Sequence, residues 1–265
     1  MKKLSLFIIS LLVVGLLAAC GTSTDEGNES TTGSESEDKK VLKMATSADY
    51  PPFEYIDTAK GSDIIGFDID LANALAEKTG YEIEVQDMDF NSLIPALQAK
   101  QIDIVLSGMT PTPEREENVD FSDIYYTANH MIVSLKDKEI KSIEELEGKT
   151  IGVQLGSIQE EKATEISEQV DLKIENRNKI SDLIQELKSG RIDAAIIEDL
   201  VANGYIEKDK DLAGFTLNAP EDEAGSAIAF QKDSKYTKEF NDALNEMKEN
   251  GELEELVSKW FGGEE

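Results

Sequence analysis

Residues 101–105 read QIDIV, and residues 191–195 echo them as RIDAA. Each segment follows a predicted amphipathic helix and leads into an apolar run, 102–106 in the first case and 192–197 in the second. Near-continuous apolar runs of this length are typical of strands that are buried on both faces of a parallel sheet. The echo therefore predicts two similar lobes, each with its own sheet.

Strand and helix patterns alternate on both sides of these segments. Short apolar or alternating runs predict further strands at 41–46, 81–85, 131–134, 150–154, 171–175 and 227–230. Helical periodicity predicts helices at 68–78, 235–249 and 252–260, with helix starts at Asn91, Ser142, Ser157 and Ser181 and helix ends at Gly80 and Gly190. Strands that alternate with helices indicate an α/β fold with mainly parallel sheets.

The N-terminus has the pattern of a bacterial lipoprotein signal. Residues 1–3 read MKK, residues 4–17 are mostly apolar, and small residues precede Cys20. The apolar run is short for a membrane span and has the right length for a secretory signal. The segment resembles a lipobox, which implies that residues 1–19 are removed and that Cys20 is acylated. The alternative is an ordinary secretory signal, or an uncleaved anchor, with an incidental cysteine.

The segment after the cysteine predicts a tether. Residues 21–38 contain only Gly, Thr, Ser, Asn, Asp and Glu. Such a composition cannot bury enough apolar surface to offset the entropy of ordering the chain. We therefore assign residues 20–40 to a lipidated cysteine and a flexible tether, with the globular part starting near Val41.

Composition excludes several classes of function. The chain has 55 acidic and 26 basic side chains, a formal charge of −29, which disfavours binding to nucleic acid or to anionic lipid headgroups. His130 and Cys20 are the only residues of their kinds, so no Cys-His or Ser-His-Asp catalytic set and no metal-ligand spacing is expected. The chain also lacks a phosphate-binding Gly-x-x-x-x-Gly-Lys loop. We expect no catalytic residues, no metal and no cofactor.

Four segments of the sequence carry motifs that stand in the same order in one known family. They are Tyr50–Glu54 (YPPFE), Gly66–Ala72 (GFDIDLA), Gly108–Arg115 (GMTPTPER) with Val119–Ser122 (VDFS), and Gly152–Ser157 (GVQLGS). Together they resemble the solute-binding proteins of polar amino acid ABC transporters. The resemblance covers about residues 41–262 and is strongest to Gram-positive lipoproteins that bind arginine and other polar amino acids.

The resemblance implies a type II periplasmic-binding-protein-like fold, with two α/β lobes joined by two crossing hinge strands and a ligand between them. Lobe 1 would comprise residues 41–128 and 227–265, and lobe 2 residues 129–226. The protein would be a monomer, anchored by lipid on the extracellular face of a Gram-positive cell membrane. It would deliver an amino acid to a membrane permease paired with an ATPase.

Arg115 is the candidate partner of the ligand carboxylate. A guanidinium forms a bidentate, charge-assisted pair that lysine cannot match. From the residues alone, Arg115 could instead pair with Glu114 or Asp120 at the surface. The resemblance implies the ligand role and also places Gly108 and Thr110 at the ligand.

The turn at Ser157 and the pair Glu198-Asp199 are the candidates from the second lobe. Backbone N–H groups where a strand meets a helix suit an anion, although Ser157 could equally be a plain helix cap. Most relatives place an aspartate at position 198 to bind the ligand ammonium. We assign this role to Glu198 and helix capping to Asp199, with the swapped assignment as the alternative.

The sequence determines the residues that recognise the ligand side chain less well than those that bind its carboxylate and ammonium groups. Tyr50 and Phe90 match positions whose rings sandwich it, and turn packing and core packing are their respective alternatives. Gln154 is a further ligand-binding candidate, and possible specificity residues are Ser47, Asp49, Glu54 and Gln159. Gram-negative relatives that bind basic amino acids have aspartate at position 47. We expect L-arginine, with glutamine, histidine or lysine as alternative ligands, and an amino-acid-sensing lipoprotein or a dehydratase as alternative functions.

Overall fold

The computed structural model describes residues 40–59, 61–217 and 225–262. The predicted signal peptide, the lipidation site Cys20 and nearly all of the predicted tether lie outside the described residues. Lys40, the last residue assigned to the tether, already belongs to the first strand. Within the described ranges, no helix is long and apolar enough to span a membrane.

The first five-stranded sheet has the order β5-β1-β6-β15-β7. β1 runs parallel to β5 and β6, whereas β15 is antiparallel to β6 and β7. We call the part of the chain built on this sheet the first lobe. Its strands are β1 (Lys40–Thr46), β5 (Tyr81–Asp87), β6 (Ile104–Val105), β7 (Val119–Phe121) and β15 (Ala229–Gln231), and its helices are α1 (Phe67–Thr79), α2 (Leu93–Gln98), α3 (Pro113–Glu116), α7 (Lys235–Asn250) and α8 (Glu252–Phe261).

The second five-stranded sheet has the order β11-β10-β12-β9-β13 and defines the second lobe. β10 is parallel to β11 and β12, and β9 is antiparallel to β12 and β13. Its strands are β9 (His130–Leu135), β10 (Thr150–Gln154), β11 (Lys173–Arg177), β12 (Ala194–Glu198) and β13 (Leu212–Leu217), and its helices are α4 (Ile158–Ser167), α5 (Ile180–Lys188) and α6 (Asp199–Lys208).

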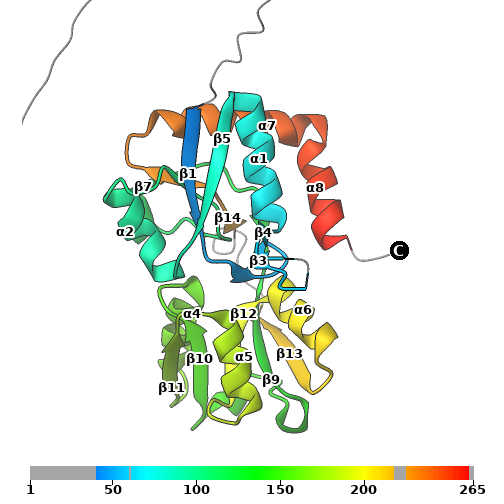
Figure 1. Cartoon of the computed structure of the whole chain (residues 1–265). Coiled ribbons are helices and arrows are strands. Elements are labelled where there is room, and N and C mark those ends of the chain that lie inside the picture. Colours follow the sequence, from blue (N-terminus) through cyan, green and yellow to red (C-terminus); the bar gives the residue numbers. More distant parts are fainter. Residues whose placement is uncertain (1–39, 60, 218–224, 263–265) are drawn as a thin grey trace, which may run out of the picture. The chain divides into compact units, whose positions relative to one another are not determined.

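Two passages of the chain connect the sheets. β8 (Tyr126–Thr127) and β14 (Gly225–Ser226) pair antiparallel with each other between the two lobes, so both connections run side by side (Figure 1). A small sheet of β2 (Asp49–Tyr50), β3 (Glu54–Ile56) and β4 (Ile64–Ile65) lies at the same level of the molecule. Short 3₁₀ helices occur at η1 (Phe90–Ser92), η2 (Lys136–Lys138) and η3 (Glu144–Leu146).

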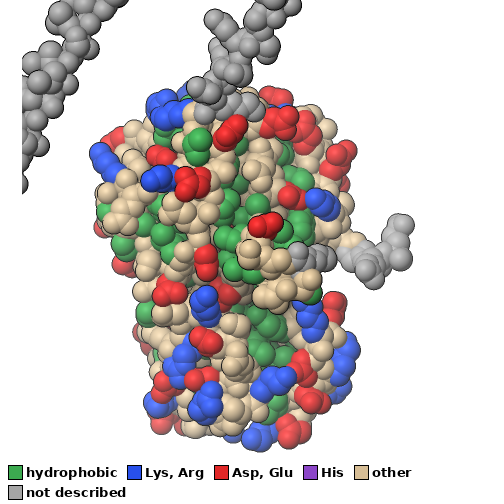
Figure 2. All heavy atoms as spheres, viewed as in Figure 1, with side chains coloured by type: hydrophobic (Ala, Val, Ile, Leu, Met, Phe, Trp, Pro, Cys, Tyr) green, Lys and Arg blue, Asp and Glu red, His purple; other side chains and the backbone are tan. Residues whose placement is uncertain are grey.

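The apolar residues of the predicted strands and helices form the cores of both lobes. The predicted α/β architecture is confirmed, but each five-stranded sheet has two parallel and two antiparallel pairings and is not mainly parallel. The strands predicted at 102–106 and 192–197 correspond to β6 and β12, which lie at the centres of the two sheets. Helix α1 buries the stripe that its periodicity predicted, and it ends at Gly80 in the left-handed conformation with φ 77°. Acidic and basic side chains are mixed over the surface seen in Figure 2.

Several local predictions need correction. Asn91 lies inside η1 rather than at a helix cap, and helix α2 follows only at Leu93. The short element after Ser142 is a 3₁₀ helix, and α5 begins at Ile180 instead of after Ser181. The sequence patterns did not indicate α6 or β13, because α6 carries only a weak apolar stripe and β13 is largely half-buried or exposed.

Gly66 gives a stability prediction, because only glycine fits where α1 begins. Its φ is 139°, and an added Cβ would lie 2.1 Å from the carbonyl oxygen of Phe53. We expect Gly66→Ala to lower the free energy of unfolding by about 3 kcal/mol or more, since backbone must move. Gly80→Ala is the matched control: φ is also positive, but the added Cβ meets nothing within 4 Å, so the cost should be about 1–2 kcal/mol. Urea unfolding of both variants measures the difference, and equal losses would contradict the steric argument.

Candidate functional site

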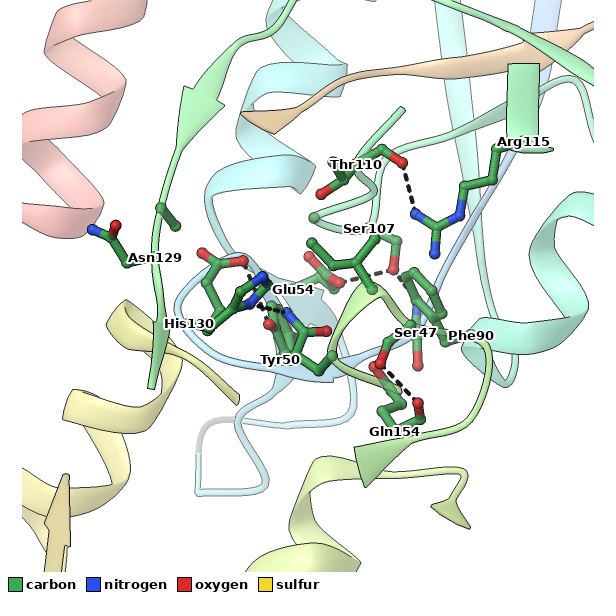
Figure 3. Close-up of a pocket in the computed structure, with 16 residues that line it drawn as sticks. Ser47, Tyr50, Glu54, Phe90, Ser107, Thr110, Arg115, Asn129, His130 and Gln154 are labelled. Carbon is green, nitrogen blue, oxygen red and sulfur yellow. Dashed lines mark hydrogen bonds between the residues drawn. The ribbon is translucent and has the colours of Figure 1, made fainter. Parts of the chain in front are cut away.

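A cleft between the lobes collects nearly all of the predicted site residues. In Figure 3, Arg115 and Phe90 lie on one side of this cleft, Asn129 and His130 on the opposite side, and Glu54 between them. The cleft is lined by Ser47, Tyr50, Glu54, Phe90, Ser107, Gly108, Thr110, Arg115, Ala128, Asn129, His130, Gln154, Ser157, Ile158, Gln159 and Glu198. Because the lining comes from both lobes, separating the lobes would take the site apart.

Arg115 is buried at the cleft, and hydrogen bonds to backbone carbonyl groups hold its side chain in place. Pro113 starts α3, and the Thr112 hydroxyl caps it by accepting from Arg115 N at 3.3 Å. The guanidinium donates to Thr110 O at 2.6 Å and to Gly156 O, in the second lobe, at 2.8 Å. Burial lowers the pKa of Arg115 to about 10, so it remains cationic at neutral pH. Among the described residues no carboxylate forms an ion pair with Arg115, which leaves its positive charge for an anion in the cleft.

Two aromatic rings contribute to the cleft wall. The Arg115 Cζ lies 5.5 Å from the centroid of the Phe90 ring, a cation–π distance. Phe90 also belongs to an apolar cluster with Leu93 and Leu97, so the ring contributes to both the core and the cleft. Tyr50 is 8% exposed, and its ring faces Gly108, where an added Cβ would lie 3.4 Å from the ring.

Glu198 is a buried carboxylate with an unused oxygen. It ends β12 and occupies the N-cap position of α6, although its side chain makes no capping hydrogen bond. The prediction that Asp199 caps this helix is therefore wrong, because Asp199 already lies in its first turn. Its Oε2 accepts a long hydrogen bond of 3.4 Å from the Tyr50 hydroxyl, whereas Oε1 is buried without a partner. Burial, with the neighbouring charge of Asp199, raises the pKa of Glu198 well above its ordinary value. An isolated buried carboxylate is unfavourable, so a cation from a ligand would relieve it.

Asp199 has other partners. Its Oδ1 accepts from Leu200 N at 2.8 Å, and its Oδ2 accepts from the Asn129 amide at 3.2 Å. It does not line the cleft, whereas Glu198 does. The geometry therefore favours Glu198 over Asp199 as the carboxylate that faces a ligand.

The turn at Ser157 already uses its donors. The Ser157 hydroxyl caps α4 by accepting from Glu160 N at 3.3 Å, and it donates to Gln154 O at 2.8 Å. Gly156 N donates to the Glu160 carboxylate at 2.7 Å. Ser157 N donates to Gln154 O at 3.3 Å, so the N–H groups of Gly156 and Ser157 both have protein partners in this structure. Ser157 is a helix cap, and its contact with an anion stays a prediction.

The specificity candidates divide into two groups. Ser47, Glu54 and Gln159 line the cleft, and the Gln159 amide lies 3.4 Å from His130 Nδ1. Asp49 does not line it: the carboxylate accepts from the Ser47 hydroxyl at 3.0 Å and from Ile180 N, in the second lobe, at 2.5 Å. Burial raises the pKa of Asp49 to about 6.

Sequence reasoning missed five lining residues. They are Ser107, Ala128, Asn129, His130 and Ile158. Ser107 lies two residues after the end of the buried strand β6, and the carboxyl ends of parallel strands are where ligand sites form, so this signal was available. The other four carry no local signal, because they reach the cleft only through the chain crossing and the packing of α4.

Comparison with known proteins places the chain in a family. Residues 42–263 match the bacterial extracellular solute-binding proteins, family 3. The chain belongs to this family. This solute-binding protein is 61% identical over 265 residues to the arginine-binding extracellular protein ArtP of Bacillus subtilis (strain 168), with all of both chains covered.

Solved structures agree with this assignment. The fold resembles an ancestral arginine-binding protein bound to arginine, with a TM-score of 0.78 and 39% identity over 83% of this chain and 98% of that one. It also resembles the substrate-binding protein AbpA from Streptococcus pneumoniae bound to L-arginine, with a TM-score of 0.78 and 35% identity over 84% of this chain and 95% of that one. The two-lobed fold that the sequence predicted is thereby confirmed.

Contacts outside the cleft also join the lobes of this solute-binding protein. The Asn178 amide donates to the Asp89 carboxylate at 2.8 Å, and Lys179 Nζ lies 4.0 Å from the Asp87 carboxylate. Together with the Asp49–Ile180 hydrogen bond, these contacts join the start of α5 and the two residues before it to the edge of the first lobe. We call residues 178–180 the clasp.

The clasp predicts a uniform effect on affinity. Asn178→Ala should weaken binding of every ligand by the same factor, about two- to tenfold, because it destabilises the closed arrangement without touching the ligand. Asn176→Ala is the matched control, since the Asn176 side chain bonds Glu160 within the second lobe. Titration of both variants with two different amino acids measures the effect. A changed ratio between the two ligands would contradict it.

Proposed function

We propose that this protein binds L-arginine outside the cell and delivers it to an ABC importer. The observation that carries the proposal is the pairing, in one cleft between two lobes, of the buried cation Arg115 with the buried, unsatisfied carboxylate Glu198. A free amino acid presents the opposite charges, a carboxylate and an ammonium, to these two groups. The 61% identity to an arginine-binding protein supports arginine as the ligand.

Each part of the ligand has a partner in the cleft. Arg115 would bind the carboxylate, and Thr110 would add a hydroxyl contact beside it. The Ser157 hydroxyl, which donates to Gln154 O in the ligand-free protein, would have to release that carbonyl oxygen in order to donate to the ligand. Glu198 would bind the ammonium through the oxygen that now lacks a partner. The side chain would extend between the rings of Tyr50 and Phe90 toward the polar end of the cleft, where Ser47, Glu54, Ser107, Gln154 and Gln159 lie.

The protein would bind its ligand without catalysing a chemical reaction. His130 is buried, with only 3% of its surface exposed. Its pKa is lowered mainly by burial and secondly by the positive charge of Lys162. A neutral imidazole that faces Gln159 suits packing and hydrogen bonding better than proton transfer. The ligand would instead stabilise the closed lobes, because it contacts both of them.

The remaining assignments are proposals of the same kind. The lobes would comprise residues 41–128 with 227–265, and residues 129–226, with β8 and β14 at the hinge. The chain would be a monomer that is attached to the outer face of the membrane through acylated Cys20. The loaded protein would dock on a permease whose ATPase partner powers uptake.

Calorimetric titration tests the ligand. The mature chain, unfolded and refolded to remove any bound amino acid, would be titrated with arginine, lysine, histidine and glutamine. Tight one-to-one binding of arginine, with weaker binding of the others, is the expected result. Tight binding of another amino acid would replace arginine but keep the class of function, and failure to bind any would overturn the proposal.

A further inference from the structure

A second pair of acidic residues lies behind the cleft wall. Glu54 in β3 and Asp68 in α1 are both fully buried. Glu54 Oε1 accepts from the Ser107 hydroxyl at 2.8 Å, and Asp68 Oδ2 accepts from Gly108 N and from the Tyr125 hydroxyl, each at 2.9 Å. Each carboxyl group therefore has one oxygen that is fixed by neighbouring donors.

The other two oxygens need a proton. Glu54 Oε2 and Asp68 Oδ1 are both buried without a donor. Glu54 and Asp68 are neighbours in the fold, because Asp68 N donates to Phe53 O at 2.9 Å and the two carboxyl groups accept from the consecutive residues Ser107 and Gly108. Two ionised carboxylates only accept hydrogen bonds and repel each other, so neither can satisfy the buried oxygen of the other unless one of them is protonated. A single proton between the two groups satisfies both buried oxygens at once.

The surroundings also disfavour a second negative charge. Within the described residues, neither Glu54 nor Asp68 forms an ion pair with lysine or arginine. Burial, and then the charge of Asp68, raises the pKa of Glu54 well above its ordinary value, and burial raises the pKa of Asp68. The other titratable groups around the pair are Asp49, Glu198, Tyr50 and Tyr125, all acids and none a cation. The hydrogen-bond partners of the pair all belong to the first lobe or to its border with the hinge, so closure of the lobes is not needed to form it.

We propose that Glu54 and Asp68 share one proton, and that a cationic ligand side chain releases this proton when it binds beside Glu54. This inference rests on the proposed function, because it assigns the recognition of side-chain charge to the same cleft. Glu54 lines the cleft and Asp68 does not. Asp68 is thus a positioning residue that acts on the ligand through Glu54.

The charges of the cleft then match a cationic amino acid. Arg115 and Glu198 balance the carboxylate and ammonium that every amino acid carries. With its proton, the Glu54–Asp68 pair has one negative charge, and without it the pair has two. A guanidinium near Glu54 favours the second state, because an opposite charge lowers the pKa of a carboxyl group. A neutral side chain such as that of glutamine offers no such compensation, so the proton stays.

The sign of the pH dependence follows. The ligand-free protein binds more protons than the arginine complex, so the affinity for arginine increases as the pH rises through the range in which the pair is protonated. The increase is at most about tenfold per pH unit for one released proton.

Proton counting by calorimetry tests the proposal. The mature protein is titrated with arginine at one pH in two buffers of different ionisation enthalpy, and the difference in heat gives the number of protons released. The wild type should release about one proton more than Glu54→Gln, whose amide cannot ionise. Any proton released by Glu198 is common to both proteins and cancels in the comparison.

Infrared spectroscopy of the ligand-free protein gives a second, independent measurement. At neutral pH the wild type should show one band of a buried protonated carboxyl group that Glu54→Gln lacks, whereas any band from Glu198 is common to both proteins and cancels in the difference spectrum. Arginine should remove the same band from the wild type. Because the ligand-free comparison needs no binding, it decides the matter even if Glu54→Gln loses its affinity for arginine.

The outcomes separate this inference from the proposed function. Arginine binding with equal proton release by wild type and variant, or ligand-free spectra of the two proteins with the same carboxyl bands, would overturn the shared proton and leave the arginine-binding function standing. A wild type that does not bind arginine would overturn the proposed function, while the infrared band would still report on the proton.

Discussion

Replacement of Arg115 by alanine is expected to weaken arginine binding by about 2–5 kcal/mol, or about 30-fold to 5,000-fold. The guanidinium is buried beside Phe90 and bonds backbone carbonyls in both lobes, at Thr110 and Gly156. Its loss would remove the only described cation that lines the cleft. The ligand carboxylate would then be desolvated without an opposite charge beside it. Removal of one partner from a buried ion pair is strongly unfavourable because the remaining charge is uncompensated. Calorimetric titration of the variant measures the change.

Two further variants separate charge from geometry. Arg115→Lys keeps the positive charge but loses the planar fork, so its affinity should fall between those of the wild type and Arg115→Ala. Arg191→Ala is the matched control, because Arg191 is a surface arginine that pairs with Glu186 in the second lobe. An Arg115→Ala variant that is folded by circular dichroism and binds arginine as tightly as Arg191→Ala would refute the role of Arg115.

Replacement of Glu198 by glutamine should have a comparably large effect on binding, with the opposite effect on stability. The amide keeps the shape of the side chain but cannot supply the charge that the ligand ammonium needs, so affinity should fall about 30-fold or more. The ligand-free protein should become more stable, because the variant removes a buried carboxylate whose Oε1 has no partner. Gains in stability at the cost of function are typical of strained binding sites.

The pH dependence of unfolding adds a signature to the same variant. The pKa of Glu198 is raised in the folded protein by burial and then by Asp199. A group with a raised folded pKa contributes stability below its unfolded pKa, and this contribution is lost as the pH rises through the folded value. The ligand-free wild type should therefore lose stability with rising pH more steeply than Glu198→Gln.

Asp199→Asn is the matched control for Glu198→Gln. Asp199 bonds Leu200 N and the Asn129 amide and stays outside the cleft, so its replacement should change arginine affinity by much less. A large loss of affinity in Asp199→Asn together with normal binding by Glu198→Gln would reverse the assignment of the two neighbouring acids.

Local patterns predicted the elements on which the site is built. The strands around Ile104 and Ile196 follow from apolar runs, and the end of α1 at Gly80 follows from the freedom of glycine to adopt positive φ. Ser157 was predicted to open a helix and does so. These features depend on residues that are close in sequence, which is why periodicity and capping chemistry could indicate them.

The arrangement of the cleft depended on contacts between distant parts of the chain. Asp49 was a specificity candidate, yet the structure directs its carboxylate to Ile180 N in the other lobe. His130 offered no sequence signal, and it reaches the cleft because β9 pairs antiparallel with β12 and places His130 opposite Glu198. Nothing in the sequence between Glu54 and Asp68 indicates that their carboxyl groups meet.

The sequence by itself determined the alternation of strands and helices, the two-lobed plan and the resemblance that pointed to Arg115 and Glu198. Those features are encoded locally, in apolar spacing and in the chemistry of short motifs. Only the tertiary structure decided which acids face the cleft, which pair with each other behind it and which join the lobes. A carboxylate has the same intrinsic chemistry at every position, and its burial and its partners, which come from distant segments, give it a separate role.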